Sequence, residues 1–239
     1  MTAAFLLSEL QSLASPEKAA GASRYFKTGV GQYGEGDQFL GIASAQIRSI
    51  AKANKATPLE ELHTLLASPW HEARSCALLI LVYRVQSKRT TEQEREEIYQ
   101  FYLQHTAACN NWDLVDLTCR DIVGNYLLHR DRTPIYQLAQ SPNLWEQRIS
   151  IVSTWTFIQV GDFADTFKLA LHFQDHPHDL IHKAVGWMLR EVGKRDICVL
   201  EDYLDTHGHQ MHRTTLRYAI EKMAPDRRQH YLTQTRTKS

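Results

Sequence analysis

The 239-residue sequence predicts an all-α protein whose helices stack in pairs as a curved α-solenoid. Three observations lead to this prediction. Almost every segment repeats its apolar residues at the period of a helix. No segment combines strand alternation with β-branched enrichment. The helical segments also come in pairs with a repeat of roughly 35 to 45 residues, which is typical of a solenoid. A compact helical bundle is the competing architecture.

Several of the expected helices begin where a Ser or Thr precedes a Pro, because Pro is favoured at the first helical position after such a cap. Examples are Ser15-Pro16, Thr57-Pro58 and Ser68-Pro69. The expected helices span residues 2–15, 16–26, 38–54, 58–67, 69–86, 91–105, 112–129, 133–140, 144–160, 162–173, 178–192, 196–206, 211–222 and 226–233. We expect one domain over residues 1–239, with a glycine-rich loop at about 28–37 and a short basic C-terminal tail.

Charge and hydropathy exclude some classes of protein. The chain has 27 Lys and Arg against 27 Asp and Glu, which argues against nucleic-acid binding by bulk charge alone. Residues 206–239 nevertheless carry seven cations and two anions, a modest indication of a phosphate-bearing partner. No apolar run approaches the ~18 residues of a membrane span, so we expect no membrane contact. The scattered cysteines indicate free thiols in a reducing cytoplasm.

The segment 179–196 is the most informative in the chain. Read as a helix, it places an apolar stripe on one face, formed by Ile181, Val185, Met188, Leu189 and Val192. Lys183, Trp187 and Arg190 fall together on the other side, next to Gly186, which leaves room for a ligand or a backbone. The aromatic residue between two cations is either an interfacial Trp covered by an aliphatic stem or a surface for an anionic, π-rich ligand.

The segment NNWDLVD is the second informative stretch. Asn111 is a helix-cap candidate, and Asp113 suits the first helical turn, where we expect it to contribute mainly to helix stability. Trp112 and Asp116 are four residues apart and are therefore neighbours on one helix face. Asp116 either pairs with Arg120 on a solvated face or, held beside an indole, faces a cationic group or a developing positive charge.

Arg148 projects into the apolar stripe of the expected helix 144–160. A cation in such a position needs an anionic partner, which is either an internal carboxylate or a phosphate. The glycine-rich segment from Lys27 to Asp37 resembles a phosphate loop only superficially, because it has no preceding strand and no Gly-Lys-Ser/Thr. We expect it to be a flexible loop between helices. The twelve histidines lack the spacing of a metal site.

Together these segments resemble the bacterial DNA alkylation repair family of AlkD type, which is built of HEAT-like (ARM/HEAT superhelical) repeats. The resemblance covers about residues 23–222. It rests on Arg24-Tyr25-Phe26-Lys27, Phe39-Leu40-Gly41-Ile42, NNWDLVD, Leu144-Trp145 followed by Arg148, and IHKAVGWMLRE. The resemblance implies a monofunctional DNA glycosylase that hydrolyses the N-glycosidic bond of cationic N3- or N7-alkylated purines, such as 7-methylguanine, in duplex DNA.

The resemblance also implies roles for individual residues. The family's catalytic Asp falls on Asp116, which would stabilise an oxocarbenium-like transition state, and its two active-site Trp fall on Trp112 and Trp187. Residues expected to contact DNA are Tyr25, Lys27, Arg148, Lys183, Arg190, Lys194, Arg213 and Arg217. We expect Tyr25, Trp112, Asp116, Arg148 and Trp187 to converge on the concave side of the array.

The expected partner is duplex DNA containing alkylated bases. No cofactor and no metal ion is expected, and we expect a monomer located in the bacterial cytosol with the nucleoid. The alternative function is a non-catalytic helical-repeat protein that binds bent or damaged DNA or a protein partner. Asp116 discriminates between the two, because a pure phosphate binder gains nothing from a carboxylate on its DNA face.

Overall fold

The structure is a computed structural model that describes residues 1–233. These residues are helical with short connections and form no strand, only an isolated bridge between Gln38 and Trp70. The all-α prediction is confirmed. The chain divides into two compact units, one from Met1 to Tyr126 and one from Leu127 onward. The single-domain assignment and the joining of all pairs into one curved array remain predictions. Arg236 and Lys238 of the predicted basic tail lie outside the described residues.

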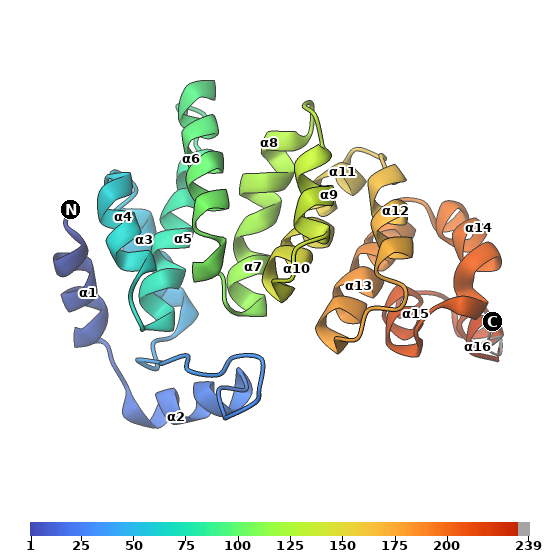
Figure 1. Ribbon diagram of the computed structural model, residues 1–239, viewed down its shortest axis with the longest axis horizontal. Helices are drawn as coiled ribbons and strands as arrows, with labels where there is room; N and C mark the ends of the chain where they lie inside the picture. Colours follow the sequence, from blue (N-terminus) through green and yellow to red (C-terminus); the bar gives the residue numbers. More distant parts are fainter. Residues whose placement is uncertain (234–239) are drawn as a thin grey trace. The chain divides into compact units, whose positions relative to one another are not determined.

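The first unit is built from the helices drawn in blue to green in Figure 1. They are α1 (Ala3–Ser12), α2 (Pro16–Tyr25), α3 (Ser44–Ala53), α4 (Leu59–Leu66), α5 (His71–Val85), α6 (Glu92–Gln104), the 3₁₀ turn Thr106–Ala108, α7 (Trp112–Cys119), the π-helical turn Arg120–Gly124 and the start of α8 (Asn125–Leu127). Most expected helices are found, with ends that differ by a few residues.

Helix α5 is the core of the first unit. It contacts α3, α4 and α7, and all its residues from His71 to Val82 are buried. Its apolar residues explain this burial, but the helix also begins with His, Glu and Arg. Buried charged groups need partners, and the partners of these three residues shape the candidate site described below.

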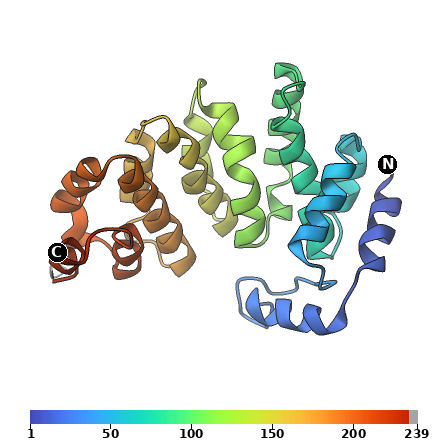
Figure 2. The same cartoon turned by 180° about the vertical axis from the view of Figure 1, so that it is seen from behind.

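Helix α2 differs from the others of its unit because none of its residues is buried. In both views it runs across the direction of its neighbours (Figures 1 and 2). Its N-terminal end is held by the backbone, since the amide of Ser15 donates to the carbonyl of Leu40 at 2.8 Å. A side chain at Gly41, which has φ of 79°, would overlap the carbonyl of Ser15 and the amide of Ala19. Glycine is therefore required for this close approach.

The second unit contains the end of α8 and the helices drawn from yellow-green to red. They are α9 (Thr133–Ala139), α10 (Leu144–Ser153), α11 (Trp155–Gln159), α12 (Ala164–His172), α13 (Asp179–Arg195), α14 (Ile197–His207), the 3₁₀ turn Gly208–Gln210, α15 (Arg213–Ala219) and α16 (Pro225–Thr233). Helix α13 is central, because it contacts α10, α11, α12, α14 and α15. Its predicted apolar stripe is confirmed, since all five residues of the stripe are buried.

No helix of the described residues has the length and apolarity to cross a membrane. Cys76, Cys109 and Cys119 are buried free thiols, whereas Cys198 is exposed.

Candidate functional site

Helix α7 begins at Trp112, as the NNWDLVD segment predicts. The side chain of Asn111, which is fully buried, accepts a hydrogen bond from the amide of Trp112 at 2.9 Å. Trp112 and Asp116 are both half-buried and lie one turn apart on α7. Residues with this spacing share a helix face. The structure therefore brings together the indole and one of the two carboxylates of the motif.

Four aromatic rings from three segments surround this helix start. The ring of Trp112 lies 5.9 Å from Tyr25 and 5.5 Å from Phe26, measured between ring centroids. Phe26 stacks on Phe39 at 5.1 Å with nearly parallel planes. Tyr25 remains 64% exposed, although it belongs to this group. Tyr25 and Trp112, predicted to act together, are thus neighbours in the first unit.

Each of the first four residues of the motif is bound to another segment. Asn110 accepts from the guanidinium of Arg74 at 3.0 Å. Asn111 makes a long contact of 3.5 Å to the carbonyl of Phe26. Trp112 packs on the rings described above, and Asp113 accepts from Nε2 of His71 at 2.9 Å. The residues before and after Trp112 are therefore both anchored to other segments, which holds the indole in place.

His71 lies at the centre of a buried polar group made of Asp37, His71, Arg74 and Asp113. Its Nδ1 is 2.8 Å from Oδ2 of Asp37, and Arg74 donates to the other oxygen of Asp37. Burial alone would lower the pKa of His71, but the hydrogen bonds to Asp113 and Asp37 raise it to about 9. Burial would raise the pKa of Asp37, but the hydrogen bond from His71 and the charge of Arg74 hold it below its usual value.

The contact with His71 corrects the expectation for Asp113. The sequence indicated a first-turn residue that contributes mainly to helix stability. Its side chain is instead only 18% exposed and ion-paired with His71, while its Oδ1 is buried and has no hydrogen-bond partner. The spacing within α7 could not reveal this contact, because His71 is 42 residues away in the sequence.

The glycine-rich loop packs against the same motif. A side chain at Gly34 would lie 2.5 Å from the carbonyl of Phe26 and 3.0 Å from Nδ2 of Asn111. The loop is also closed on itself, because the amide of Gly34 donates to Lys27 at 3.1 Å and that of Gly31 to Glu35 at 2.8 Å. The loop is thus closed by hydrogen bonds; it begins beside Tyr25 and ends at the buried Asp37, and its flexibility stays a prediction.

In the second unit, Arg148 is buried on α10, with 5% of its surface exposed. Its Nη1 donates to the carbonyl of Leu180 at 2.6 Å, next to the start of α13. The carbonyl of Leu180 is one partner of this guanidinium, and the carboxylate or phosphate that the sequence indicated stays a prediction. Arg148 therefore connects two helices that contact each other.

The predicted cations of α13 are held by neighbouring acids. Lys183 pairs with Asp179 at 2.8 Å, and Lys194 pairs with Glu191 at 2.7 Å. Arg190 pairs with Glu221 from beyond α15. This face is therefore not uniformly positive, because each of the three cations has a carboxylate within reach, and its role as a surface for an anionic ligand stays a prediction. A phosphate would have to share or displace these carboxylates.

Trp187 is half-buried and donates from its indole nitrogen to Glu191 at 3.1 Å. Glu191 is 8% exposed and also accepts from Lys194, so it orients the indole from one turn along α13. Gly186 packs against α15. A side chain there would lie 2.5 Å from both the carbonyl of Thr215 and Cβ of Tyr218, so the approaching group is the backbone of α15.

The other predicted DNA contacts lie at the surface. Lys27 is exposed and has φ of 57° at the start of the loop. Arg213 is exposed at the start of α15 and donates to the carbonyl of Leu232 at 3.0 Å. Arg217 is exposed on the same helix. Tyr25, Lys27, Trp112 and Asp116 belong to the first unit and the remainder to the second, so the convergence of the two sets remains a prediction.

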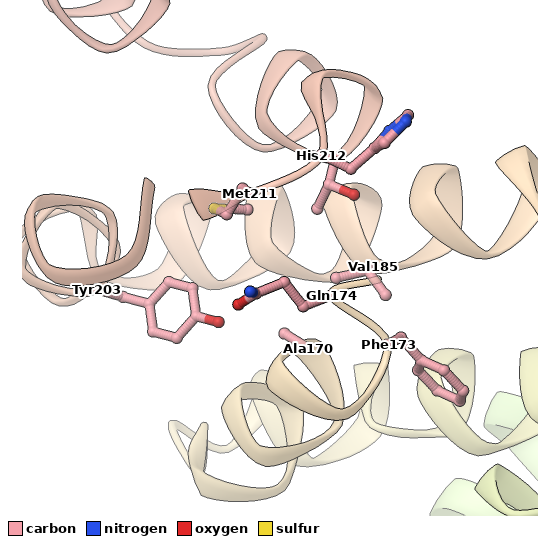
Figure 3. Close-up of a pocket in the computed structure, with 8 residues that line it drawn as sticks. Ala170, Phe173, Gln174, Val185, Tyr203, Met211 and His212 are labelled. Atoms are coloured by element: carbon pink, nitrogen blue, oxygen red, sulfur yellow. The ribbon is translucent and has the colours of Figure 1, made fainter. Parts of the chain in front are cut away.

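Two cavities can be described, and neither is lined by a predicted site residue. The cavity in Figure 3 lies in the second unit and is lined by Phe173, Tyr203 and Met211 among others; its volume is about 10 Å³, enough for a single water. An open cleft of about 630 Å³ in the first unit is lined by residues such as Lys55, Arg84 and Glu94, and none of the predicted site residues lines it.

Comparison with known proteins now identifies the family. Residues 6–223 match the family model described as DNA alkylation repair enzyme. The chain belongs to this family. A solved structure, described as a predicted DNA alkylation repair enzyme from Enterococcus faecalis, superposes with a TM-score of 0.67 at 20% identity, covering 89% of this chain and 97% of that one. This likeness supports the fold alone. No curated protein matches the sequence.

Membership of the DNA alkylation repair family assigns the protein a role in DNA repair, with DNA as the substrate. Within the part of the chain that the structure describes, no group of three or more His, Cys, Asp or Glu side chains is arranged to hold a metal ion. His176, His178 and His182 lie near one another, and burial lowers the pKa of each.

The sequence revealed the segments around Trp112 and Trp187 but not the residues that hold them. Asp37, His71 and Arg74 hold the NNWDLVD segment, and Glu191 holds the indole of Trp187. One signal was available for two of them. His71 and Arg74 stand at the start of the helix that contains the apolar run from Ala77 to Tyr83, where polar side chains are buried and must find partners. The identity of those partners is a property of the tertiary structure.

Proposed function

We propose that the protein is a monofunctional DNA glycosylase that releases cationic N3- or N7-alkylated purines, such as 7-methylguanine, from duplex DNA. The observation that carries this proposal is the pairing of Trp112 and Asp116 on one face of α7. An indole held by other rings beside a half-buried carboxylate suits a reacting sugar that becomes positively charged. The family supports a repair role, and the specific reaction is our inference.

The reaction requires little from the enzyme at the leaving group, because an alkylated purine already carries a positive charge. Cleavage of the glycosidic bond moves that charge to the deoxyribose as an oxocarbenium ion. The carboxylate of Asp116 would stabilise this ion by Coulomb attraction, in a site that the neighbouring rings partly shield from water. Water then adds to C1′ of the sugar and loses a proton, so the base leaves intact and no covalent intermediate with the protein is needed.

The aromatic residues would bind the lesion without a deep pocket. Trp112 and Tyr25 present a half-buried and an exposed ring on the same side of the first unit. Such rings contact sugars and stabilise nearby positive charge through their faces.

The second unit would contribute Trp187 and contacts to the DNA backbone. Arg148 is buried, so it would not contact a phosphate that stays at the protein surface. Its proposed contact is with a phosphate that comes close to Leu180, near the start of α13. Lys183, Arg190 and Lys194 are the candidates for the outer phosphates. Arg213 and Arg217 on α15 would extend this contact, and Lys27 would contribute one from the first unit.

The decisive experiment is the release of free base from a duplex that contains 7-methylguanine, under single-turnover conditions. Asp116→Asn keeps the shape of the side chain and removes its charge, so excision should slow by roughly 10²-fold or more. Affinity for the methylated duplex should hold or rise slightly, because a negative charge near the phosphates is removed.

The matched control is Asp121→Asn, in the turn that follows α7. Asp121 is a half-buried carboxylate that accepts from Gln86 at 2.9 Å, and an amide oxygen can still accept that bond. This variant should excise at the wild-type rate. Equal losses in both variants would assign Asp116 a structural role. A wild-type protein that binds the duplex and releases no base would instead be the non-catalytic DNA-binding alternative.

A further inference from the structure

The buried group around His71 has a defined protonation state. Nδ1 and Nε2 of His71 lie 2.8 and 2.9 Å from carboxylate oxygens of Asp37 and Asp113. Ionised carboxylates only accept hydrogen bonds, and a neutral imidazole can donate only one. Both contacts are satisfied together only when both ring nitrogens carry hydrogen. The geometry therefore requires an imidazolium between two carboxylates.

The surrounding charges agree with this assignment. Arg74, from the next turn of α5, donates to Asp37 and Asn110 and also to the carbonyl of Ser68 at 2.8 Å. The two cations, His71 and Arg74, then balance the two anions, Asp37 and Asp113. The adjacent Glu72 is bound elsewhere: its carboxylate accepts from the amides of residues 40, 41 and 42. With a neutral His71, the buried group would carry an excess negative charge.

This balanced group is mechanically connected to the indole of Trp112. The ring of His71 stacks on Phe39 at 4.6 Å and lies 5.1 Å from Phe26, which in turn contacts Trp112. Asp113 follows Trp112 in the chain. Asp37 ends the glycine-rich loop that packs on Asn111. Phe26, Asp113 and Asp37, which belong to the segments around the indole, are thus each in direct contact with His71.

We propose that His71 is a positioning residue for base excision, a protonated clamp between Asp37 and Asp113 that holds Trp112 in place for the lesion. This inference rests on the proposed glycosylase function. His71 itself is 3% exposed and does not touch the substrate. It acts by joining α5, α7 and the glycine-rich loop, so that the indole beside Asp116 keeps one orientation.

Loss of the proton would open the clamp. A neutral His71 keeps one donor, so one of the two carboxylates loses its hydrogen bond and is left buried near the other. Because the pKa of His71 is raised to about 9, the clamp is closed at neutral pH and opens as the pH rises through that value. Glu72, Arg74 and Asn110 are the other polar groups near the ring. Arg74 already donates to Asp37 and would keep that hydrogen bond when His71 is neutral.

Two measurements test the clamp. The first is NMR of the histidine side chains in the wild-type protein at pH 8, where His71 should carry hydrogen on both ring nitrogens. The second is single-turnover excision from pH 6.5 to 9.5 by the wild type and His71→Gln, which is neutral at every pH. At pH 7.5 the variant should be slower by roughly 10- to 100-fold, the range for a small misplacement of a reacting group. The ratio of the two rates should fall towards one as the pH rises through 9.

Controls separate positioning from general damage. His63→Gln changes an exposed histidine of α4 and should excise at the wild-type rate. Duplex affinity of His71→Gln should stay within about threefold of wild type, because the phosphate contacts are untouched. If His71→Gln does not fold, Asp113→Asn provides the second variant, since it removes the same clamp from the α7 side and should slow excision in the same pH range.

The outcomes distinguish this inference from the proposed function. A wild type that releases no base refutes the glycosylase proposal, and the positioning role falls with it. An active wild type whose rate is matched by His71→Gln at pH 7.5 refutes only the role of His71. A neutral His71 ring at pH 8 refutes the clamp, whatever the rates.

Discussion

The buried imidazolium makes a quantitative prediction for stability against pH. His71 has a pKa of about 9 in the folded protein against 6.5 for a free histidine. Because the folded state holds the proton more tightly, His71 stabilises the protein fully below pH 6.5, and this contribution is lost between pH 6.5 and about 9. At 1.36 kcal/mol per pKa unit, the contribution is roughly 3 kcal/mol. His71 is 3% exposed, so solvent screening reduces it little.

The assay is urea unfolding at constant ionic strength in steps from pH 6 to pH 9.5, for the wild type and His71→Gln. The wild type should lose roughly 3 kcal/mol more than the variant across this range. Other groups cancel in the difference. The buried thiols of Cys76 and Cys109 have pKa values of about 12 and weaken both proteins equally at high pH. Burial lowers the pKa values of His176, His178 and His182 in both proteins alike. Parallel curves for the two proteins would refute the imidazolium.

Two further predictions concern the loop and the backbone contacts. Gly34→Ala should destabilise the protein by about 1–3 kcal/mol and slow excision, because its Cβ would lie 2.5 Å from the carbonyl of Phe26. Gly29→Ala is its control in thermal unfolding, since the nearest atom there ends a flexible side chain; equal losses would contradict the packing argument. The double reversal Lys183→Glu and Arg190→Glu should weaken binding to all duplexes alike and reduce the salt slope by about 2. Unchanged affinity at low salt would remove α13 from the DNA surface.

Most of the fold could be predicted because helix periodicity is local. The stripe of Ile181, Val185 and Met188 is buried in the structure because spacings of three and four residues place them on one side of any helix. The cap at Asn111 is equally local, since it bonds to the adjacent residue. Division into two compact units was not predicted, because it depends on which helices contact each other across the chain.

The partners of the charged residues could be predicted only in part. Lys183 with Asp179 and Lys194 with Glu191 follow the helical spacing of ion pairs and were open to prediction. The pair of Arg190 with Glu221 spans 31 residues and two helices, so no local rule indicates it. The same holds for His71, whose two carboxylates come from 34 residues before it and 42 residues after it.

The motif NNWDLVD therefore carries two carboxylates whose work differs because their surroundings differ. Asp113 points to a buried cation, so its charge is already balanced and is not available to a substrate. In the proposed reaction, the carboxylate that stabilises the forming cation is that of Asp116, which lies one turn on, on the face of the indole. We propose this role for Asp116 and not for Asp113 because Asp113 is bound to the buried His71, 42 residues away in sequence, whereas Asp116 shares its helix face with Trp112.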